Sequence, residues 1–408
     1  MKNFFKERLE KYSLLYNIFR KAYIFIYYYI IIRTLSILFK VFPIRNNRIV
    51  VCNYLGKGYS DNPKAIVNEL LKNNKFEIIW ALNSSYWNNN MLPKQIKKVK
   101  YQSIKYLYYL TTAKIWIDNT RKSFTSIKRK NQFYIQTWHA GLTEKKVEKD
   151  VIDKLEKSYV KNAIKDSKNA DLFISNSNWE TKLYKKSFWY SGEILEKGLP
   201  RNDILINTLN HEIIKQKVYE NLGIKSDVNI LLYAPTFRKD YNVESYDINI
   251  ENLINTLEKN TNNKWISLIR LHPNITEKSK SLKYNKKIFD VSNYSDLNEL
   301  LISAKVLITD YSSLMFEFGY LKKPVYIYAS DIDEYISDRG FMFDFNELPF
   351  PLSTNNEELI KNILNFNNSK YIKDLKKFYK SVGLNETGES SKEVVKIILK
   401  ECEINEKK

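Results

Sequence analysis

The sequence is poor in cysteine and histidine. Its 408 residues contain two cysteines, Cys52 and Cys402, and three histidines. Cysteines so far apart do not suggest a disulfide framework, and no Cys/His cluster has the spacing of a zinc site. These absences argue against a disulfide-stapled fold and favour a reducing compartment such as the cytosol. We expect neither a metal nor a cofactor.

An apolar segment of membrane-spanning length is also missing. The uncharged run at residues 22–32 has eleven residues and ends at Arg33, whereas a spanning helix needs about twenty. No small-residue cleavage site of a signal peptide follows it. Its Tyr, Ile and Phe residues, flanked by Lys and Arg, are typical of a helix in the membrane interface. We expect residues 1–45 to form a membrane-associating amphipathic helical leader; a true span and a helix docked on the soluble part are the alternatives.

Positive charge, in contrast, is abundant. Lys and Arg number 66 against 46 Asp and Glu, a formal net charge of +20, and residues 1–45 hold nine basic residues against Glu7 and Glu10. A nucleic acid, an anionic membrane surface or a phosphate-bearing substrate would each explain this charge. No zinc finger, RNP-like aromatic motif or helix-turn-helix accompanies it, so we expect no nucleic acid as partner.

Short apolar strands alternate with amphipathic helices from residue 46 onward, and the pattern restarts after a polar stretch. Such alternation is typical of parallel, doubly wound sheets. The sequence therefore predicts an α/β protein with two Rossmann-like domains facing a cleft, at residues 46–206 and 228–408, with a hinge and linker helix at 207–227. Ligands are expected at the carboxyl ends of the strands. The predicted strands are residues 48–53, 76–82, 114–118, 132–137, 172–175, 228–233, 265–271, 288–291, 306–309 and 325–328.

Two of the three histidines follow predicted strands, one in each domain. His139 lies in Thr-Trp-His-Ala-Gly and His272 in Arg-Leu-His-Pro. An imidazole can accept or donate a proton near neutral pH, as an attacking alcohol requires. A packed or capping histidine is the ordinary alternative for either one, but two at equivalent strand ends favour a functional pair. His211, in the polar linker, is expected at the surface.

The segment after the strand at 306–309 predicts an anion site. A helix is expected to begin near Ser313, with Ser312 or Ser313 as its cap. The free N–H groups and positive dipole end of that helix would point into the cleft and suit a phosphate. Ordinary capping without a ligand explains the same residues equally well.

Arginines gather around the same cleft. Their guanidinium groups suit bidentate phosphate binding and the charge that builds up in phosphoryl transfer. Each alone is typical of a surface salt bridge, but together they fit a diphosphate better than a neutral ligand. Asp331, after another strand end, can bind ribose or glycerol hydroxyls or can belong to a solvated acidic loop. The four arginines are Arg201, Arg238, Arg270 and Arg339.

A series of short motifs gives the sequence a family resemblance. Between residues 46 and 363 it resembles the CDP-glycerol glycerophosphotransferases, the teichoic acid primases and polymerases of GT-B fold. Any one motif is weak, but the ordered series is specific. The motifs are residues 56–64 (GKGYSDNPK), 136–141 (QTWHAG), 198–203 (GLPRND), 232–238 (LYAPTFR), 270–272 (RLH), 294–301 (YSDLNELL), 309–313 (TDYSS) and 339–344 (RGFMFD).

The resemblance implies a reaction and a role for each site. It implies that His139 is the base that deprotonates the acceptor hydroxyl, and that His272, Arg238 and the helix end at Ser312 and Ser313 hold the diphosphate of CDP-glycerol. The alcohol would then attack the phosphorus that bears the glycerol and release CMP. The other residues expected in the cleft are, on the donor side, Arg270, Thr309, Asp310, Asp331 and Arg339, and, on the acceptor side, Trp138, Lys145, Arg201 and Asp203.

The leader suits a lipid-linked acceptor. We expect a peripheral enzyme at the cytoplasmic face of the cell membrane, acting in teichoic acid or capsule synthesis. Two positions depart from the family pattern: residues 138–143 read WHAGLT where Trp-His-Gly-Thr-Pro is usual, and Pro273 stands where an aromatic residue is common. Both imidazoles remain, so the expected chemistry is kept, whereas the identity of the acceptor does not carry over.

Two alternatives stay open from the sequence. A transferase of the same fold would use CDP-ribitol or a nucleotide sugar. A basic membrane- or nucleic-acid-binding protein would have no turnover at all.

Overall fold

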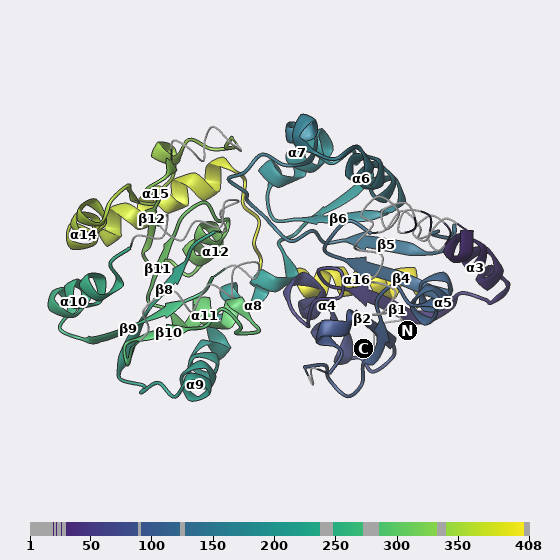
Figure 1. Cartoon of the computed structure of the whole chain (residues 1–408), viewed down its shortest axis with the longest axis horizontal. Coiled ribbons are helices and arrows are strands. Elements are labelled where there is room, and N and C mark those ends of the chain that lie inside the picture. Colours follow the sequence, from purple (N-terminus) through teal and green to yellow (C-terminus); the bar gives the residue numbers. More distant parts are fainter. Residues whose placement is uncertain are drawn as a thin grey trace.

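Two parallel sheets organise the chain. The computed structural model describes residues 19, 22, 26, 30–88, 91–122, 127–236, 248–271, 285–332 and 340–403. Within these ranges one sheet has seven strands in the order β3-β2-β1-β4-β5-β6-β7, and the other has six in the order β10-β9-β8-β11-β12-β13. The sheets occupy separate halves of the molecule (Figure 1). The predicted fold of two doubly wound α/β domains is confirmed.

The first domain contains the predicted strands together with β3 and β7, which were not predicted. Its strands are β1 (Arg45–Cys52), β2 (Glu77–Leu82), β3 (Lys97–Lys100), β4 (Ala113–Asp118), β5 (Phe133–Gln136), β6 (Leu172–Ser175) and β7 (Glu193–Glu196). Its helices are α3 (Ile32–Leu38), α4 (Asp61–Leu71), α5 (Ile104–Thr112), α6 (Lys157–Asn169) and α7 (Asn178–Ser187). The 3-10 turn η5 (Pro200–Asn202) and the short helix α8 (Asp203–Ile206) lead to the linker helix α9 (His211–Leu222).

The second domain repeats this plan around a smaller sheet. Its strands are β8 (Val228–Ala234), β9 (Lys264–Ile269), β10 (Ile288–Asp290), β11 (Val306–Thr309), β12 (Val325–Tyr328) and β13 (Leu352–Ser353), of which β13 was not predicted. Its helices are α10 (Ile250–Thr261), α11 (Leu297–Ser303), α12 (Leu314–Tyr320), α14 (Asn356–Leu364) and α15 (Asn368–Ser381).

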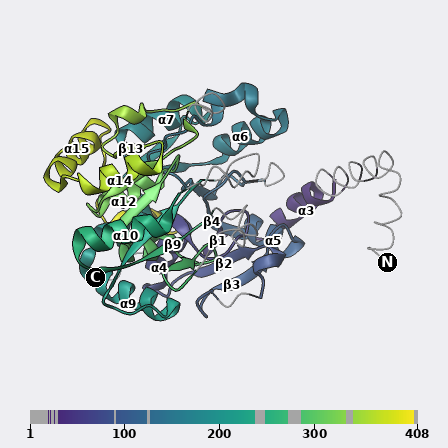
Figure 2. The same ribbon diagram turned by 60° about the vertical axis from the view of Figure 1, so that its left-hand side comes forward.

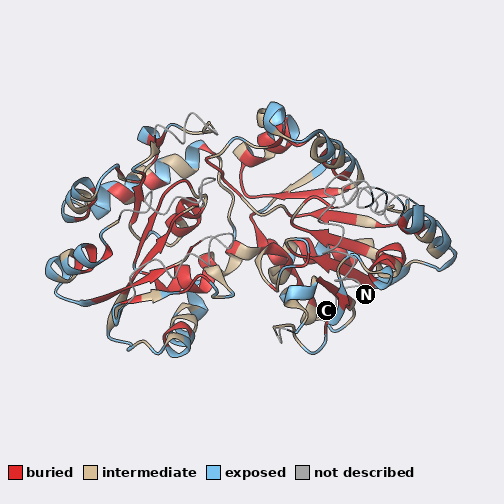
Figure 3. Cartoon of the chain, in the orientation of Figure 1, coloured by how far each residue is buried: buried red, intermediate tan, exposed pale blue. Residues whose placement is uncertain are grey.

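Both faces of each sheet are covered, which explains why the strands read as nearly continuous apolar runs. In β1, Ile49 and Val51 join the core on one face, while Val50 and Cys52 join the core on the other. Figure 3 shows the strands buried and the outer faces of the helices exposed. This arrangement leaves the ends of the strands, and not the faces of the sheets, available for ligands.

The order of the strands fixes where such ligands can lie. In the first sheet the order reverses between β1 and β4, and in the second between β8 and β11. The loops beyond the carboxyl ends of these strands separate at the reversal and leave a crevice. His139 follows β5, the strand next to β4.

The last helix of the chain corrects one predicted domain boundary. Residues 228–408 were expected to form the second domain, but α16 (Ser390–Glu401) packs on the first. Its Val394 and Ile398 lie in the same core as Ile49 and Ile66. Figure 1 shows this yellow helix among the purple and blue elements of the first domain. The physical reason is an apolar stripe on α16, which packs against α4 and η5 of the first domain.

Helix α3 is the described part of the predicted leader. It lies beside α5 at the far edge of the first domain (Figure 2). The rings of Phe39 and Phe42, just beyond α3, contact Tyr108 on α5 at centroid distances of 5.7 and 5.4 Å. Among the residues that the structure describes, no helix is both long enough and apolar enough to cross a bilayer.

The packing of α16 gives a stability prediction. Ile398 is fully buried, so Ile398→Ala should lower the free energy of unfolding by about 2–5 kcal/mol through lost transfer energy and a residual cavity. Lys400→Ala, on an exposed position of the same helix, should change it by less than about 0.5 kcal/mol. Urea denaturation of both variants measures the difference, and equal losses would argue against α16 as part of this core.

Candidate active site

His139 has a defined tautomer. Its Nδ1 lies 2.7 Å from the backbone carbonyl oxygen of Asn119, which follows β4. A carbonyl oxygen only accepts hydrogen bonds, so Nδ1 carries the hydrogen and Nε2 keeps its lone pair. Within the described part of the chain Nε2 makes no hydrogen bond. The half-buried ring therefore offers one basic nitrogen.

The surroundings of His139 keep the imidazole neutral. Burial lowers its pKa below the ordinary 6.5, and the nearby Arg201 guanidinium lowers it further. The Asn119 carbonyl and the Asp61 carboxylate act in the opposite direction, because they stabilise the imidazolium. A neutral imidazole near pH 7 is the form that can accept a proton.

Trp138 supports the histidine from a strained position. Its φ of +51° is in the left-handed region, which a non-glycine residue occupies only when its surroundings hold it there. The Trp138 and His139 ring centroids are 4.3 Å apart. The Arg121 guanidinium lies 5.4 Å from the Trp138 centroid, and this buried arginine pairs with Glu148 and Asp166. The structure thus places the expected cleft residue Trp138 directly against the imidazole.

The loop after β1 supplies a carboxylate beside His139. Tyr54 donates its backbone N–H to Asn119 Oδ1 at 2.8 Å, and its hydroxyl donates to Asp61 Oδ2 at 2.6 Å. Asp61 also has a left-handed φ, +62°. Sequence reasoning assigned no role to Tyr54, Asp61 or Asn119. The motif at 56–64 contains Asp61, but an aspartate in the first turn of a helix is also an ordinary helix start.

Arg201 joins the two domains. Its Nη1 donates to Asp61 Oδ2 at 2.8 Å and to the backbone oxygen of His139 at 2.7 Å. Its Nη2 pairs with Glu317 on α12 of the second domain. Asn298, on α11, donates to the backbone oxygen of Arg201 at 2.6 Å. Arg201 therefore lies between the two domains, and its guanidinium is held by carboxylates of the protein itself; Glu317 was not predicted.

Thr309 and Asp310 lie at the reversal point of the second sheet. The Thr309 hydroxyl donates to the backbone oxygen of Ala234 at 2.7 Å, and Asp310 Oδ1 accepts from the backbone N–H of Thr236 at 2.8 Å. Both side chains are buried. These two hydrogen bonds fasten the end of β11 to the end of β8.

The start of α12 is capped by Ser312. Its hydroxyl accepts from the backbone N–H of Leu314 at 3.3 Å, whereas Ser313 is the N-cap residue without a side-chain hydrogen bond. Asp331 lies nearby, since its Oδ1 accepts from the Tyr311 hydroxyl at 2.8 Å. Ser312, Ser313 and Asp331 are thus grouped beyond β11 and β12.

Arg270 braces its own domain. Its Nη1 donates to the backbone oxygen of Tyr294 at 2.7 Å, and burial lowers its pKa below the ordinary value.

Lys145 forms an isolated antiparallel bridge with Phe341 of the second domain, and its ammonium lies 3.4 Å from Glu144. The loop after His139 therefore touches the second domain directly.

Asp203 is committed to a structural contact. Its two carboxylate oxygens accept from the backbone N–H groups of Ser390 and Ser391 at 2.8 and 2.7 Å, the first turn of α16. Both carboxylate oxygens of Asp203 are thus used to bind the start of α16, and not in the cleft role that was expected. Three other predicted residues, Arg238, His272 and Arg339, lie outside the described residues.

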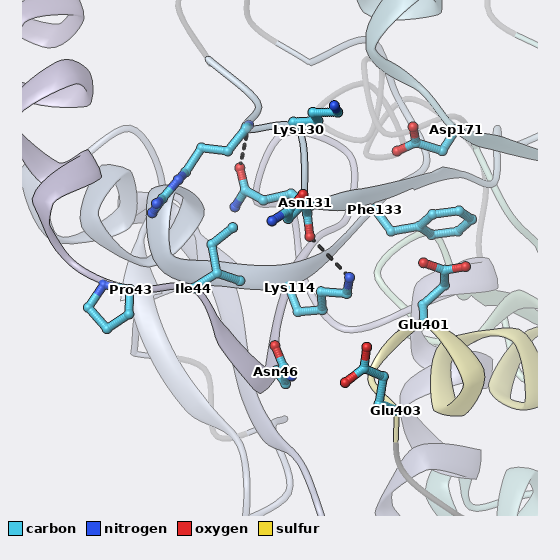
Figure 4. Close-up of a pocket in the computed structure, with 12 residues that line it drawn as sticks. Pro43, Ile44, Asn46, Lys114, Lys130, Asn131, Phe133, Asp171, Glu401 and Glu403 are labelled. Atoms are coloured by element: carbon cyan, nitrogen blue, oxygen red, sulfur yellow. Dashed lines mark hydrogen bonds between the residues drawn. The ribbon is translucent and has the colours of Figure 1, made fainter.

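An open pocket lies away from these groups. It has a volume of about 790 Å³ and is lined by residues at the starts of β4 and β5, such as Lys114 and Phe133 (Figure 4). His139 lies beyond the opposite ends of these strands. The charged residues of the pocket balance: they are Lys114, Arg129, Lys130, Asp171, Glu401 and Glu403. We place the active site at the carboxyl ends, where the imidazole and its partners meet.

Comparison with known proteins identifies the family of the chain. The family model of the CDP-glycerol:poly(glycerophosphate) glycerophosphotransferases matches residues 34–400. The chain belongs to this family. It is 33% identical over 390 residues to a teichoic acid poly(glycerol phosphate) polymerase of Bacillus spizizenii, which covers 91% of this chain and 97% of that protein. A teichoic acid glycerol-phosphate transferase of Staphylococcus aureus is 31% identical, covering 87% and 93% respectively.

Solved structures of this glycerophosphotransferase family have the same fold. A variant of the wall teichoic acid polymerase TagF, soaked with CDPG, superimposes with a TM-score of 0.81 at 30% identity, covering 95% of this chain and 98% of that one. The chain spans about half the length of the Bacillus subtilis poly(glycerol phosphate) polymerase, to which it is 31% identical. The family expected from the motifs is confirmed.

The position of His139 predicts its titration. We expect its imidazole to titrate below pH 6.5, and Asp61→Asn to lower the pKa further, because the carboxylate that stabilises the imidazolium is lost. Since the folded-state pKa is the lower one, stability should be unaffected above pH 6.5 and should fall as the pH drops through the folded-state value.

NMR of ¹³C-histidine-labelled protein measures this titration, with His139→Gln identifying the signal. A pKa at or above 6.5, or an upward shift in Asp61→Asn, would contradict the assignment.

Proposed function

We propose that the protein transfers glycerol phosphate from CDP-glycerol to a hydroxyl of a teichoic acid chain, with release of CMP. The observation that carries this proposal is the neutral imidazole of His139, whose Nε2 is available beside the second domain. Membership of the glycerophosphotransferase family and the likeness to TagF support the reaction and the donor.

His139 acts as the base in this reaction. Its Nε2 accepts the proton of the acceptor hydroxyl as the oxygen forms a bond to the phosphorus that bears glycerol. The bond from that phosphorus to the bridging oxygen breaks, and CMP leaves with the electron pair. The Asp61 carboxylate stabilises the resulting imidazolium, and its hydrogen bonds to Tyr54 and Arg201 hold it in place.

The donor binds at the second sheet. Phosphoryl transfer asks a protein mainly for positioning and for stabilisation of charge on the phosphate oxygens. Thr309 and Asp310 at the sheet reversal, with Ser312 and Ser313 beyond them, lie where such a fold binds nucleotides. The other proposed donor residues are Arg238, Arg270, His272, Asp331 and Arg339.

We further propose that the enzyme works on a lipid-linked acceptor as a peripheral protein at the cytoplasmic face of the membrane. In and around α3 the chain exposes large apolar side chains; that of Val41 is 82% exposed. Burial lowers the pKa of Lys165, and the positive charges of Arg33 and Lys161 lower it further, so cationic residues of α3 and α6 lie close enough to interact electrostatically. Apolar groups rimmed by cations suit an anionic bilayer. The exposed apolar residues are Ile30, Ile31, Ile37, Leu38, Val41 and Phe42.

Loss of the base tests the reaction. His139→Gln should lower CMP release from CDP-glycerol by about 10²–10⁴-fold, because general-base assistance is removed. Calorimetry should show CDP-glycerol affinity within about twofold of wild type. His211→Gln, on the linker helix, is the matched control and should keep the wild-type rate.

A donor panel separates the alternatives. Wild-type enzyme should release CMP from CDP-glycerol faster than from CDP-ribitol, and no UDP from UDP-sugars. A preference for CDP-ribitol or UDP release would replace the proposed donor, and no turnover with any donor would favour a binding protein.

The membrane proposal predicts a charge-dependent affinity. Arg33→Glu combined with Lys161→Glu should weaken binding to phosphatidylglycerol vesicles, with each cation near the surface contributing about 1 kcal/mol. Lys376→Glu with Lys377→Glu, on exposed positions of α15 in the other domain, is the control. CMP release with a soluble acceptor should stay unchanged in both. Vesicle sedimentation measures the affinity, and equal binding of the two double variants would refute this surface.

A further inference from the structure

Residue 201 is fastened to both domains through its main chain. Its N–H donates to Asn62 Oδ1 at 3.0 Å in the first domain, and its carbonyl oxygen accepts from Asn298 Nδ2 at 2.6 Å in the second. It lies in η5, a single turn between β7 and α8. The main chain of Arg201 is therefore held by one hydrogen bond from each domain, at the point where the two domains meet.

The side chain of Arg201 continues this link toward the active site. Its Nη1 bonds both Asp61 and the backbone oxygen of His139, and its Nη2 pairs with Glu317 on α12. The side chains of all three charged residues are at most 10% exposed. At such low exposure the charge-assisted bonds are strong, and removal of the guanidinium would leave two buried carboxylates without a counter-charge.

The main chain at His139 needs this support. The preceding residue, Trp138, has a left-handed φ, and such a conformation persists only where neighbouring groups enforce it. The ring of His139 is held at Nδ1 by Asn119, and its backbone oxygen is held by Arg201. Asn62 and Gln136 of the first domain hold the Trp138 backbone, whereas the Arg201 contact links the His139 backbone to the second domain. Loss of the Arg201 contact should therefore leave the tautomer unchanged and loosen the direction of the imidazole.

We propose that Arg201 is a positioning residue that couples the docking of the second domain to the placement of His139. Glu317 reaches the guanidinium from α12, and the two carboxylates together hold it in the orientation that bonds the His139 backbone. The base is then aligned only while the second domain, which is proposed to carry the donor, is docked. The inference rests on the proposed role of His139 as the base.

A second ion pair across the domains provides a control. Lys64 on α4 pairs with Asp296 at 2.5 Å, with side chains 25% and 20% exposed. This contact also joins the domains, but it does not touch the guanidinium of Arg201; Asp296 reaches only the main chain of Arg201, by way of Asn298. Removing it tests for a general effect of weakened docking.

The test compares Glu317→Gln with Lys64→Gln. Glu317→Gln keeps the shape of the side chain and removes its charge. It should lower kcat for CMP release by about tenfold or more, the size expected when a hydrogen bond to a charged group is lost, while KM for CDP-glycerol stays within about twofold. The ¹³C signal of His139 should shift in this variant. Lys64→Gln should match wild type in kcat and in the His139 signal.

The outcomes separate this inference from the function on which it rests. Wild-type kcat together with an unmoved His139 signal in Glu317→Gln would overturn it, as would an equal loss of kcat in Lys64→Gln. If wild type releases no CMP, the proposed function fails. In that case the ¹³C signal of His139 in Glu317→Gln, compared with wild type, shows by itself whether Glu317 and His139 are coupled. Should Glu317→Gln not fold, Arg201→Lys is judged by the same criteria, because lysine keeps the positive charge but lacks the planar guanidinium that donates several hydrogen bonds at once.

Discussion

One guanidinium shared by carboxylates of two domains holds the centre of this molecule together. Arg201 lies between Asp61 and Glu317, and each of these charges is buried. The two carboxylates tolerate burial because the guanidinium lies between them; without it, both would be buried with no counter-charge. These three charges therefore fix how the domains meet. They also bring the loop after β1, the segment that carries His139 and the helix α12 to one place.

Much of the fold follows from the sequence because central parallel strands are apolar on both faces. The predicted strands at 172–175, 306–309 and 325–328 agree with β6, β11 and β12 to the residue. The missed strands lie at sheet edges. In β3 only Val99 is buried among lysines, and β7 is Glu-Ile-Leu-Glu with no buried residue. An edge strand forms by adding to a sheet that already exists, so its own residues need not show the apolar pattern from which strands are predicted.

Candidate site residues could be predicted from the sequence where they directly follow a buried strand. They could not be predicted where their contacts join segments that are far apart in the sequence. His139, Trp138 and Arg201 could be singled out from local patterns. The contacts of Arg201 with Asp61 and Glu317 could not, because they join segments 140 and 116 positions away. Asp203 shows the converse. It resembled a cleft residue in its motif, yet its carboxylate caps a helix 187 positions further on.

That distant helix has a consequence for biosynthesis. Helix α16 covers Ile49 and Ile66 of the first domain, yet it follows every strand of the second domain in the chain. The first domain is therefore translated first but still lacks part of its hydrophobic cover when the second domain has already left the ribosome. Domains usually fold in the order of their synthesis. Here the second can reach its final packing earlier, and the first keeps an apolar face accessible to chaperones until α16 has been synthesised.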